Sequence, residues 1–187
     1  MTGVISQFAF WVSLSSAGLI FLLASISVKN SKFQFWPPPG KKSWQHRTFM
    51  LLFRIYLYPL IVLTALQFEM LEGMKAVIQY GIGGVLLLIG FGLAFRITLV
   101  MGWRNAFGEK RGLRTTGWFA RSRNPIYVVT WIGLLGWALI ANSLPVSMLL
   151  AIWALLYSLA PLLEEPWLEK EYGEEYLQYK RQTPRFL

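Results

Sequence analysis

The sequence contains no cysteine and no aspartate, and its only histidine is His46. Without cysteine, disulfides and thiolate-bound metals are excluded, and a single histidine argues against a histidine-based metal site. We therefore expect no metal cofactor. Charge is also scarce, because Asp, Glu, Lys and Arg make up 14% of the chain where a soluble domain has about 25%. This composition argues against a soluble domain.

Apolar residues are abundant instead, at 55% of the chain, with a mean hydropathy of +0.46. They form runs close to the roughly 20 residues that a helix needs to cross a bilayer. These runs predict five transmembrane helices, at 4–27, 48–68, 76–101, 125–142 and 146–163. We therefore expect an all-α, polytopic integral membrane protein.

We interpret the chain as a single membrane domain, 1–187, with two parts. Residues 1–101 would hold three transmembrane helices, and residues 102–187 would hold a polar loop, a helical hairpin and a polar tail. No Lys or Arg precedes the first apolar run, so we expect a retained helix and not a secretory signal peptide.

The basic residues predict how the helices are oriented. Of 18 Lys and Arg residues, fifteen lie in 28–47, 102–124 and 164–187, while only Lys75 lies in a loop on the opposite side. Because Lys and Arg collect in cytoplasmic loops, the N-terminus should lie outside and the C-terminus in the cytoplasm. We expect a multi-pass protein of a bacterial inner membrane. This distribution also explains the net charge of +9 without a nucleic-acid partner.

Two polar stretches should then meet on the cytoplasmic face, residues 112–127 and the pair Glu164-Glu165. The first is basic and leads into Pro125, which suits the first turn of a helix. The carboxylate pair could bind an ammonium group or act as acid and base. The alternative is that the pair is an ordinary solvated helix end.

The remaining two basic residues, Arg54 and Arg96, lie inside predicted helices. A charge at the bilayer centre costs about 2.5–3.5 kcal/mol on insertion scales, but both lie near enough to the cytoplasmic surface to extend toward it. The alternative is that they face inward and hold an anionic group of a cofactor or lipid. They are our candidates for substrate contacts.

Two further patterns predict packing. Glycines recur in the third helix at Gly81, Gly83, Gly90 and Gly92, and glycine allows membrane helices to approach closely. In the tail, apolar and tyrosine residues spaced by four, four and three share one helical face; they are Leu168, Tyr172, Tyr176 and Tyr179. We expect this face to lie on the membrane surface or against the core, with Gly173 as a possible αL helix end.

Several motifs in residues 96–184 follow one another in a familiar order. They are Leu113-Arg114, Gly117-Trp118-Phe119, Arg123-Asn124-Pro125-Ile126-Tyr127, Glu164-Glu165 and Tyr172-Gly173-Glu174-Glu175-Tyr176-Leu177-Gln178-Tyr179. This pattern resembles the superfamily of membrane-embedded isoprenylcysteine carboxyl methyltransferases and phospholipid methyltransferases.

The resemblance implies an S-adenosylmethionine-dependent methyltransferase that acts on a membrane-soluble, lipid-like acceptor. It implies a cofactor site formed by Leu113, Arg114, Gly117, Phe119, Arg123, Asn124, Tyr127 and Glu164. Glu164 would take the ammonium group of the cofactor, and the candidates for catalytic residues are Asn124 and Glu165.

The sequence departs from the superfamily pattern at two positions. Asn124 stands where a histidine is usual, and asparagine cannot titrate near neutral pH. Ala160 stands where the isoprenylcysteine enzymes have an arginine for the substrate carboxylate, which argues against that substrate. Two alternatives stay open: an NADPH-dependent reductase of the related sterol reductase type, and a non-catalytic membrane scaffold.

Overall fold

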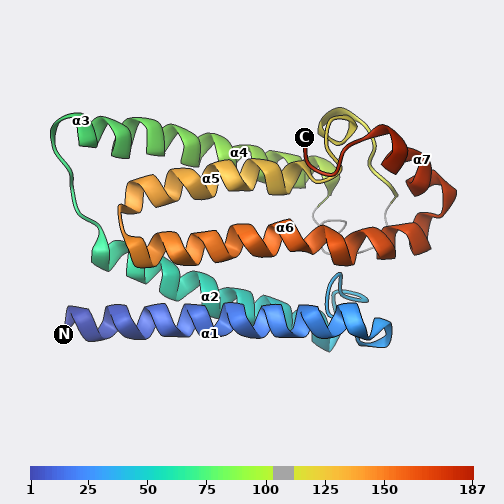
Figure 1. The fold of residues 1–187 in the computed structure, drawn as a ribbon, viewed down its shortest axis with the longest axis horizontal. Helices are drawn as coiled ribbons and strands as arrows, with labels where there is room; N and C mark the ends of the chain where they lie inside the picture. Colours follow the sequence, from blue (N-terminus) through green and yellow to red (C-terminus); the bar gives the residue numbers. More distant parts are fainter. Residues whose placement is uncertain (103–111) are drawn as a thin grey trace.

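Long helices run side by side through most of the molecule, and no strand occurs in residues 1–102 or 112–187, which the computed structural model describes (Figure 1). In chain order the elements are α1 (Thr2–Lys29), η1 (Ser31–Phe33), α2 (Trp44–Gln67), α3 (Gly73–Ala76), the π-helical η2 (Val77–Ile82), α4 (Gly83–Met101), η4 (Gly117–Ala120), α5 (Pro125–Ala141), α6 (Leu144–Tyr172) and α7 (Glu174–Gln182). Three basic residues counted above, Arg104, Lys110 and Arg111, lie outside the described residues.

Four helices in the described part of the chain are long and apolar enough to cross a bilayer. They are α1, α2, the continuous helix Gly73–Met101 and α6. The apolar helix α5 is shorter, at 17 residues, which is the lower end of the range for a membrane span. The predicted all-α membrane fold is confirmed, and the sidedness of the termini stays a prediction.

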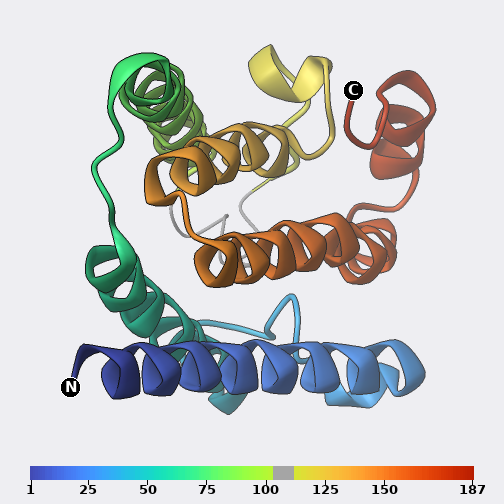
Figure 2. The ribbon, with the colours of Figure 1, turned by 60° about the vertical axis from the view of Figure 1, so that its left-hand side comes forward.

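The helices form two pairs with α6 between them (Figures 1 and 2). Helix α1 packs along α2, α4 packs along α5, and α6 contacts both pairs. The segment before α5, the end of α6, α7 and the C-terminus all lie at one end of the bundle, and the N-terminus lies at the other (Figure 1). The two polar stretches identified in the sequence therefore meet.

Glycine lets α4 and α5 lie almost backbone to backbone. A Cβ atom on Gly90 would stand 2.1 Å from the backbone nitrogen of Gly133, and one on Gly136 would stand 2.3 Å from that of Leu87. No larger side chain fits at either position. The predicted close packing is thus confirmed at Gly90, whereas Gly92 faces open space.

Serine hydroxyls join α1 to α2. The Ser13 hydroxyl donates to the Tyr56 carbonyl over 2.9 Å, and the Ser16 hydroxyl donates to the Leu52 carbonyl over 2.6 Å. Small residues and interhelical hydrogen bonds are typical of packing in membranes, where burial of apolar surface gives little net attraction. The first two helices therefore form one wall of the molecule.

The end predicted for the fifth helix was wrong. We expected it to span 146–163, but α6 continues to Tyr172 through Pro161 and Pro166, so Glu164-Glu165 lies inside the helix. The polar residues mark where the chain leaves the apolar layer, yet glutamate is a good helix former and helices of membrane proteins tolerate proline. The helix therefore continues beyond its apolar stretch.

Gly173 separates α6 from α7 with φ +54° and ψ −129°. The predicted helix end is confirmed, but its conformation is not αL. The turn brings Tyr176 and Tyr179 of α7 back onto α4 and α5, where they pack in a cluster with Ile97 and Phe119. The tyrosine face of the tail thus lies against the core, on two helices where we expected one.

Candidate active site

A cavity of about 830 Å³ lies between the two helix pairs and reaches the end where the polar stretches meet. Ligand sites are typically about 300–1,000 Å³, so it is large enough for a cofactor. Most of its lining is apolar. Nearly all of the cofactor and catalytic residues predicted from the sequence line it: Leu113, Arg114, Phe119, Arg123, Asn124, Tyr127, Glu164 and Glu165.

Glu164 presents a carboxylate to this cavity. Its Oε1 atom accepts a hydrogen bond of 2.6 Å from the indole Nε1 of Trp36 and another from the hydroxyl of Tyr127. The Tyr127 ring in turn packs on Tyr157, with 4.6 Å between ring centroids. Both donors are neutral, and no Lys or Arg of the described residues pairs with Glu164. The carboxyl group is therefore held in position by neutral donors.

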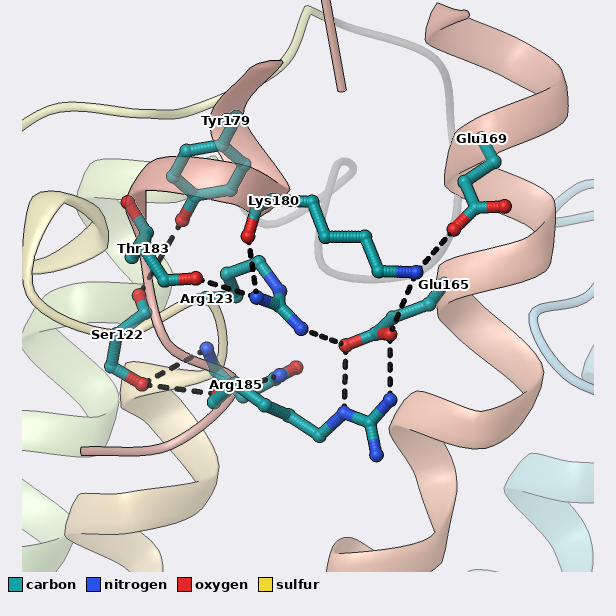
Figure 3. Close-up of polar contacts among 9 residues, drawn as sticks. Ser122, Arg123, Glu165, Glu169, Tyr179, Lys180, Thr183 and Arg185 are labelled. Atoms are coloured by element: carbon teal, nitrogen blue, oxygen red, sulfur yellow. Dashed lines mark hydrogen bonds and ion pairs between the residues drawn. The ribbon is translucent and has the colours of Figure 1, made fainter. Parts of the chain in front are cut away.

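Glu165 is only 4% exposed and has cationic partners (Figure 3). The guanidinium of Arg123 donates to Oε1 over 2.7 Å, and that of Arg185 donates to both carboxylate oxygens over 2.9 and 2.8 Å. The Lys180 ammonium lies 3.7 Å from Oε2. The hydrogen bonds to Glu165 raise the pKa of Arg185. This carboxylate joins α6 to the loop and the C-terminal segment.

The residues before α5 are also bonded to the last residues of the chain. Arg123 donates from its backbone N–H to the Pro184 carbonyl over 2.9 Å and from its guanidinium to the Thr183 carbonyl over 2.5 Å. The Asn124 side chain donates to the Arg185 carbonyl over 3.0 Å. The C-terminal segment therefore fixes the wall of the cavity that carries Arg123 and Asn124.

Helix α7 holds the η4 turn in the same way. The Tyr179 hydroxyl donates to the Phe119 carbonyl over 2.7 Å. Burial raises the pKa of this hydroxyl to about 12, so it stays protonated and remains a donor at neutral pH. Phe119, itself 8% exposed, is thereby kept at the edge of the cavity.

The structure does not bring every predicted site residue to the cavity. Gly117 opens the η4 turn with φ +65° and does not line it. Arg54 and Arg96 are exposed on α2 and α4, and neither lines it. A headgroup held by these arginines would therefore have to lie outside the cavity.

Three residues in this site escaped the sequence reasoning. Trp36 was assigned no part in the site, Tyr157 fell within the predicted helix 146–163, and Arg185 was counted only among the basic residues of the tail. Nothing local in the sequence links any of them to the Glu pair, since Trp36 is 128 positions from Glu164. In residues 1–102 and 112–187, no group of three or more metal-ligating side chains is present.

The family model described as phospholipid methyltransferase matches residues 78–175, just over half of the chain. The protein belongs to the phospholipid methyltransferase family. Its function class is therefore a methyltransferase of lipid-like substrates, in agreement with the resemblance found in the sequence. Searches of curated proteins and of solved structures returned no match.

The phospholipid methyltransferase match runs from η2 to the start of α7. It contains the polar stretch before α5 and the pair Glu164-Glu165 of α6. Trp36 and Arg185, which bond to those glutamates, lie outside the matched residues. This chain therefore completes a family core with contacts from the loop between α1 and α2 and from its last residues.

Proposed function

We propose that the protein is an S-adenosylmethionine-dependent methyltransferase that acts on a lipid-like acceptor at the cytoplasmic face of the membrane. The observation that carries this proposal is the Glu164 carboxylate, which lines a large cavity and has hydrogen bonds but no cationic partner among the described residues. A partly buried carboxylate that is bonded only to neutral donors favours a cationic ligand.

The residues present fit this donor. S-adenosylmethionine is a cation with an ammonium group, a carboxylate and an adenine ring. Glu164 would take the ammonium group, and Arg114, which lines the cavity and has no ion pair within the described residues, would take the carboxylate. Phe119 and Leu113 also line the cavity and offer apolar surface for the ring.

The donor supplies a methyl group on a sulfonium that is already a good leaving group, so the protein has to align the reactants and exclude water. Tyr127 and Trp36 orient Glu164, and Glu165 with its arginines fixes the wall that carries Asn124. We propose that Glu165 is a positioning residue, because its oxygens are already bonded to Arg123 and Arg185.

The acceptor side of the cavity is apolar, as a membrane-soluble acceptor requires. Ala160 lines it, so no cation stands at the position where a substrate carboxylate would be held in the isoprenylcysteine enzymes. We propose a lipid-like acceptor, such as a lipid amine, that reaches the cavity from within the bilayer.

Titration of the purified protein tests the donor. We expect saturable binding of S-adenosylmethionine, and transfer of its labelled methyl group to a lipid extract of native membranes. Binding of NADPH in place of S-adenosylmethionine would support a reductase, and binding of neither would support a scaffold.

Cysteine labelling tests the cytoplasmic orientation. Because the chain contains no cysteine, single cysteines at Thr115 and Gln178 have no background. In intact cells, neither should react with a membrane-impermeant maleimide until the membrane is opened. A labelled residue in intact cells would reverse the orientation.

A further inference from the structure

The cavity has an inner end, away from the residues proposed to bind S-adenosylmethionine. Trp153 lines it eleven residues before Glu164 on α6, which corresponds to about 16 Å at 1.5 Å per residue. Tyr56 and Phe91 line the cavity there too, with ring centroids 5.9 and 6.4 Å from that of Trp153. The cavity therefore extends from the polar end to the middle of the bundle.

The inner end offers almost nothing to a polar ligand. The Tyr56 hydroxyl donates to the Leu149 carbonyl over 2.7 Å, and the Thr130 hydroxyl donates to the Ile126 carbonyl over 2.7 Å. The indole N–H of Trp153 has no hydrogen-bond partner among the described residues. Because these two hydroxyls are already used and aromatic and aliphatic side chains such as Tyr56, Phe91 and Leu156 form the walls, the group that fits here is apolar.

The inner end is also closed. Trp153 is 7% exposed, and its ring meets Phe53 and Tyr157 edge to face at 5.2 and 6.0 Å. Beyond it lie Leu60 and Leu149, which have no exposed surface. A closely packed aromatic ring leaves little room for movement. Trp153 thus forms a fixed floor.

We infer that the inner end binds the hydrocarbon chain of the acceptor and that Trp153 selects its length. This inference rests on the proposed function, in which the acceptor is lipid-like and its reacting group lies near Glu164. A hydrocarbon chain that fills the inner end of the cavity gains contacts along its walls, whereas a longer hydrocarbon chain meets the indole ring of Trp153.

Two variants should change the preferred length in opposite directions. Trp153→Ala removes the floor, and Ala94→Phe narrows the inner end from α4, where Ala94 lines the cavity three residues after Phe91. Trp137→Ala is the matched control, because Trp137 belongs to the same aromatic cluster but does not line the cavity. If Trp153→Ala does not fold, Trp153→Leu replaces it.

The probes are lysophosphatidylethanolamines of increasing acyl length, measured by competition against a fluorescent analogue on protein in nanodiscs. Overfilling a packed interior is unfavourable, so a chain too long for the wild type should bind roughly tenfold weaker. Trp153→Ala should remove this loss of affinity, Ala94→Phe should shift it to shorter chains, and the control should leave it unchanged.

An unchanged length profile in both folded variants would overturn the inference, as would a shift in Trp137→Ala equal to that in Trp153→Ala. S-adenosylmethionine is titrated separately with each protein. If S-adenosylmethionine binds but the length profile is unchanged, the methyltransferase proposal stands and only the length inference fails. If the wild type does not bind S-adenosylmethionine, the methyltransferase proposal is contradicted whatever the length profile shows.

Discussion

Glu164 and Glu165 are neighbours on one helix and have opposite surroundings. Glu165 is bonded to the guanidinium groups of Arg123 and Arg185 and lies near the Lys180 ammonium. Glu164 accepts hydrogen bonds from Trp36 and Tyr127, and no cation of the described residues pairs with it. Successive positions on a helix point about 100° apart, so the Glu165 carboxylate meets the C-terminal segment and the Glu164 carboxylate meets Trp36 and Tyr127.

This difference suggests two roles: Glu165 stabilises the site, and Glu164 binds a ligand. A buried charge with several cationic partners stabilises an arrangement that fails when one partner is removed. A partly buried carboxylate with only neutral donors stays available to an incoming cation. If this division is correct, substitutions at the two positions should affect different measurements.

The largest effect should follow from Glu165→Ala. It leaves the guanidinium of Arg123, whose side chain is 9% exposed, buried without its carboxylate, and breaking a buried pair costs about 3–5 kcal/mol. For a protein of this size we expect the thermal midpoint in detergent to fall by roughly 10 °C.

Glu169→Ala is the matched control for this variant. Glu169 pairs with Lys180 over 2.5 Å, but both side chains are more than a third exposed, and such pairs contribute about 0–1 kcal/mol. Equal destabilisation by the two variants would contradict the anchoring role of Glu165.

The second effect concerns donor affinity. Glu164→Gln keeps the shape of the side chain and removes its charge, and a hydrogen bond to a charged group contributes about 1.5–3 kcal/mol. The affinity for S-adenosylmethionine should fall roughly tenfold to a hundredfold, while the thermal midpoint should change little. Unchanged affinity in the folded variant would show that Glu164 is an ordinary helix residue.

A smaller loss of affinity for S-adenosylmethionine should follow from Tyr127→Phe. This change keeps the ring that packs on Tyr157 and removes the hydroxyl that orients Glu164. Since Trp36 still donates to the same oxygen, we expect the donor affinity to fall only about threefold to tenfold. Calorimetric titration measures it. In the double variant with Glu164→Gln, the two losses should not add, because both act through one carboxylate.

The sequence predicted the architecture because apolar runs and basic loops are local signals. Length and composition alone located the helices to within a few residues at most ends. The exception was the end of α6, where the helix continues beyond its apolar stretch to Tyr172. Polarity marks where a helix leaves the apolar layer, whereas hydrogen bonding decides where it ends.

The sequence placed both glutamates in the site but could not tell them apart. Their difference depends on Trp36, from the loop before α2, and on Arg185, close to the C-terminus. Such long-range contacts have no periodicity that a single sequence displays. The segment that carries Arg123 and Asn124 was recognised from its motif, but its bonds to Thr183 and Pro184 became visible only in the fold.

The smallest effect should come from Arg54 and Arg96, which we propose contact an anionic headgroup of the acceptor. Both are exposed and neither lines the cavity, so each contact would be near the surface, where an ion pair contributes about 0–1 kcal/mol. Arg54→Ala and Arg96→Ala should each raise the KM for a phosphate-bearing lipid amine no more than about fivefold. The donor affinity should stay at the wild-type value, since Glu164 and its donors are untouched. The assay uses nanodiscs of uncharged lipid, so that the acceptor supplies the only phosphate under study. If neither variant changes the KM, the headgroup is held elsewhere, and the cavity wall near Arg114 becomes the place to search for it.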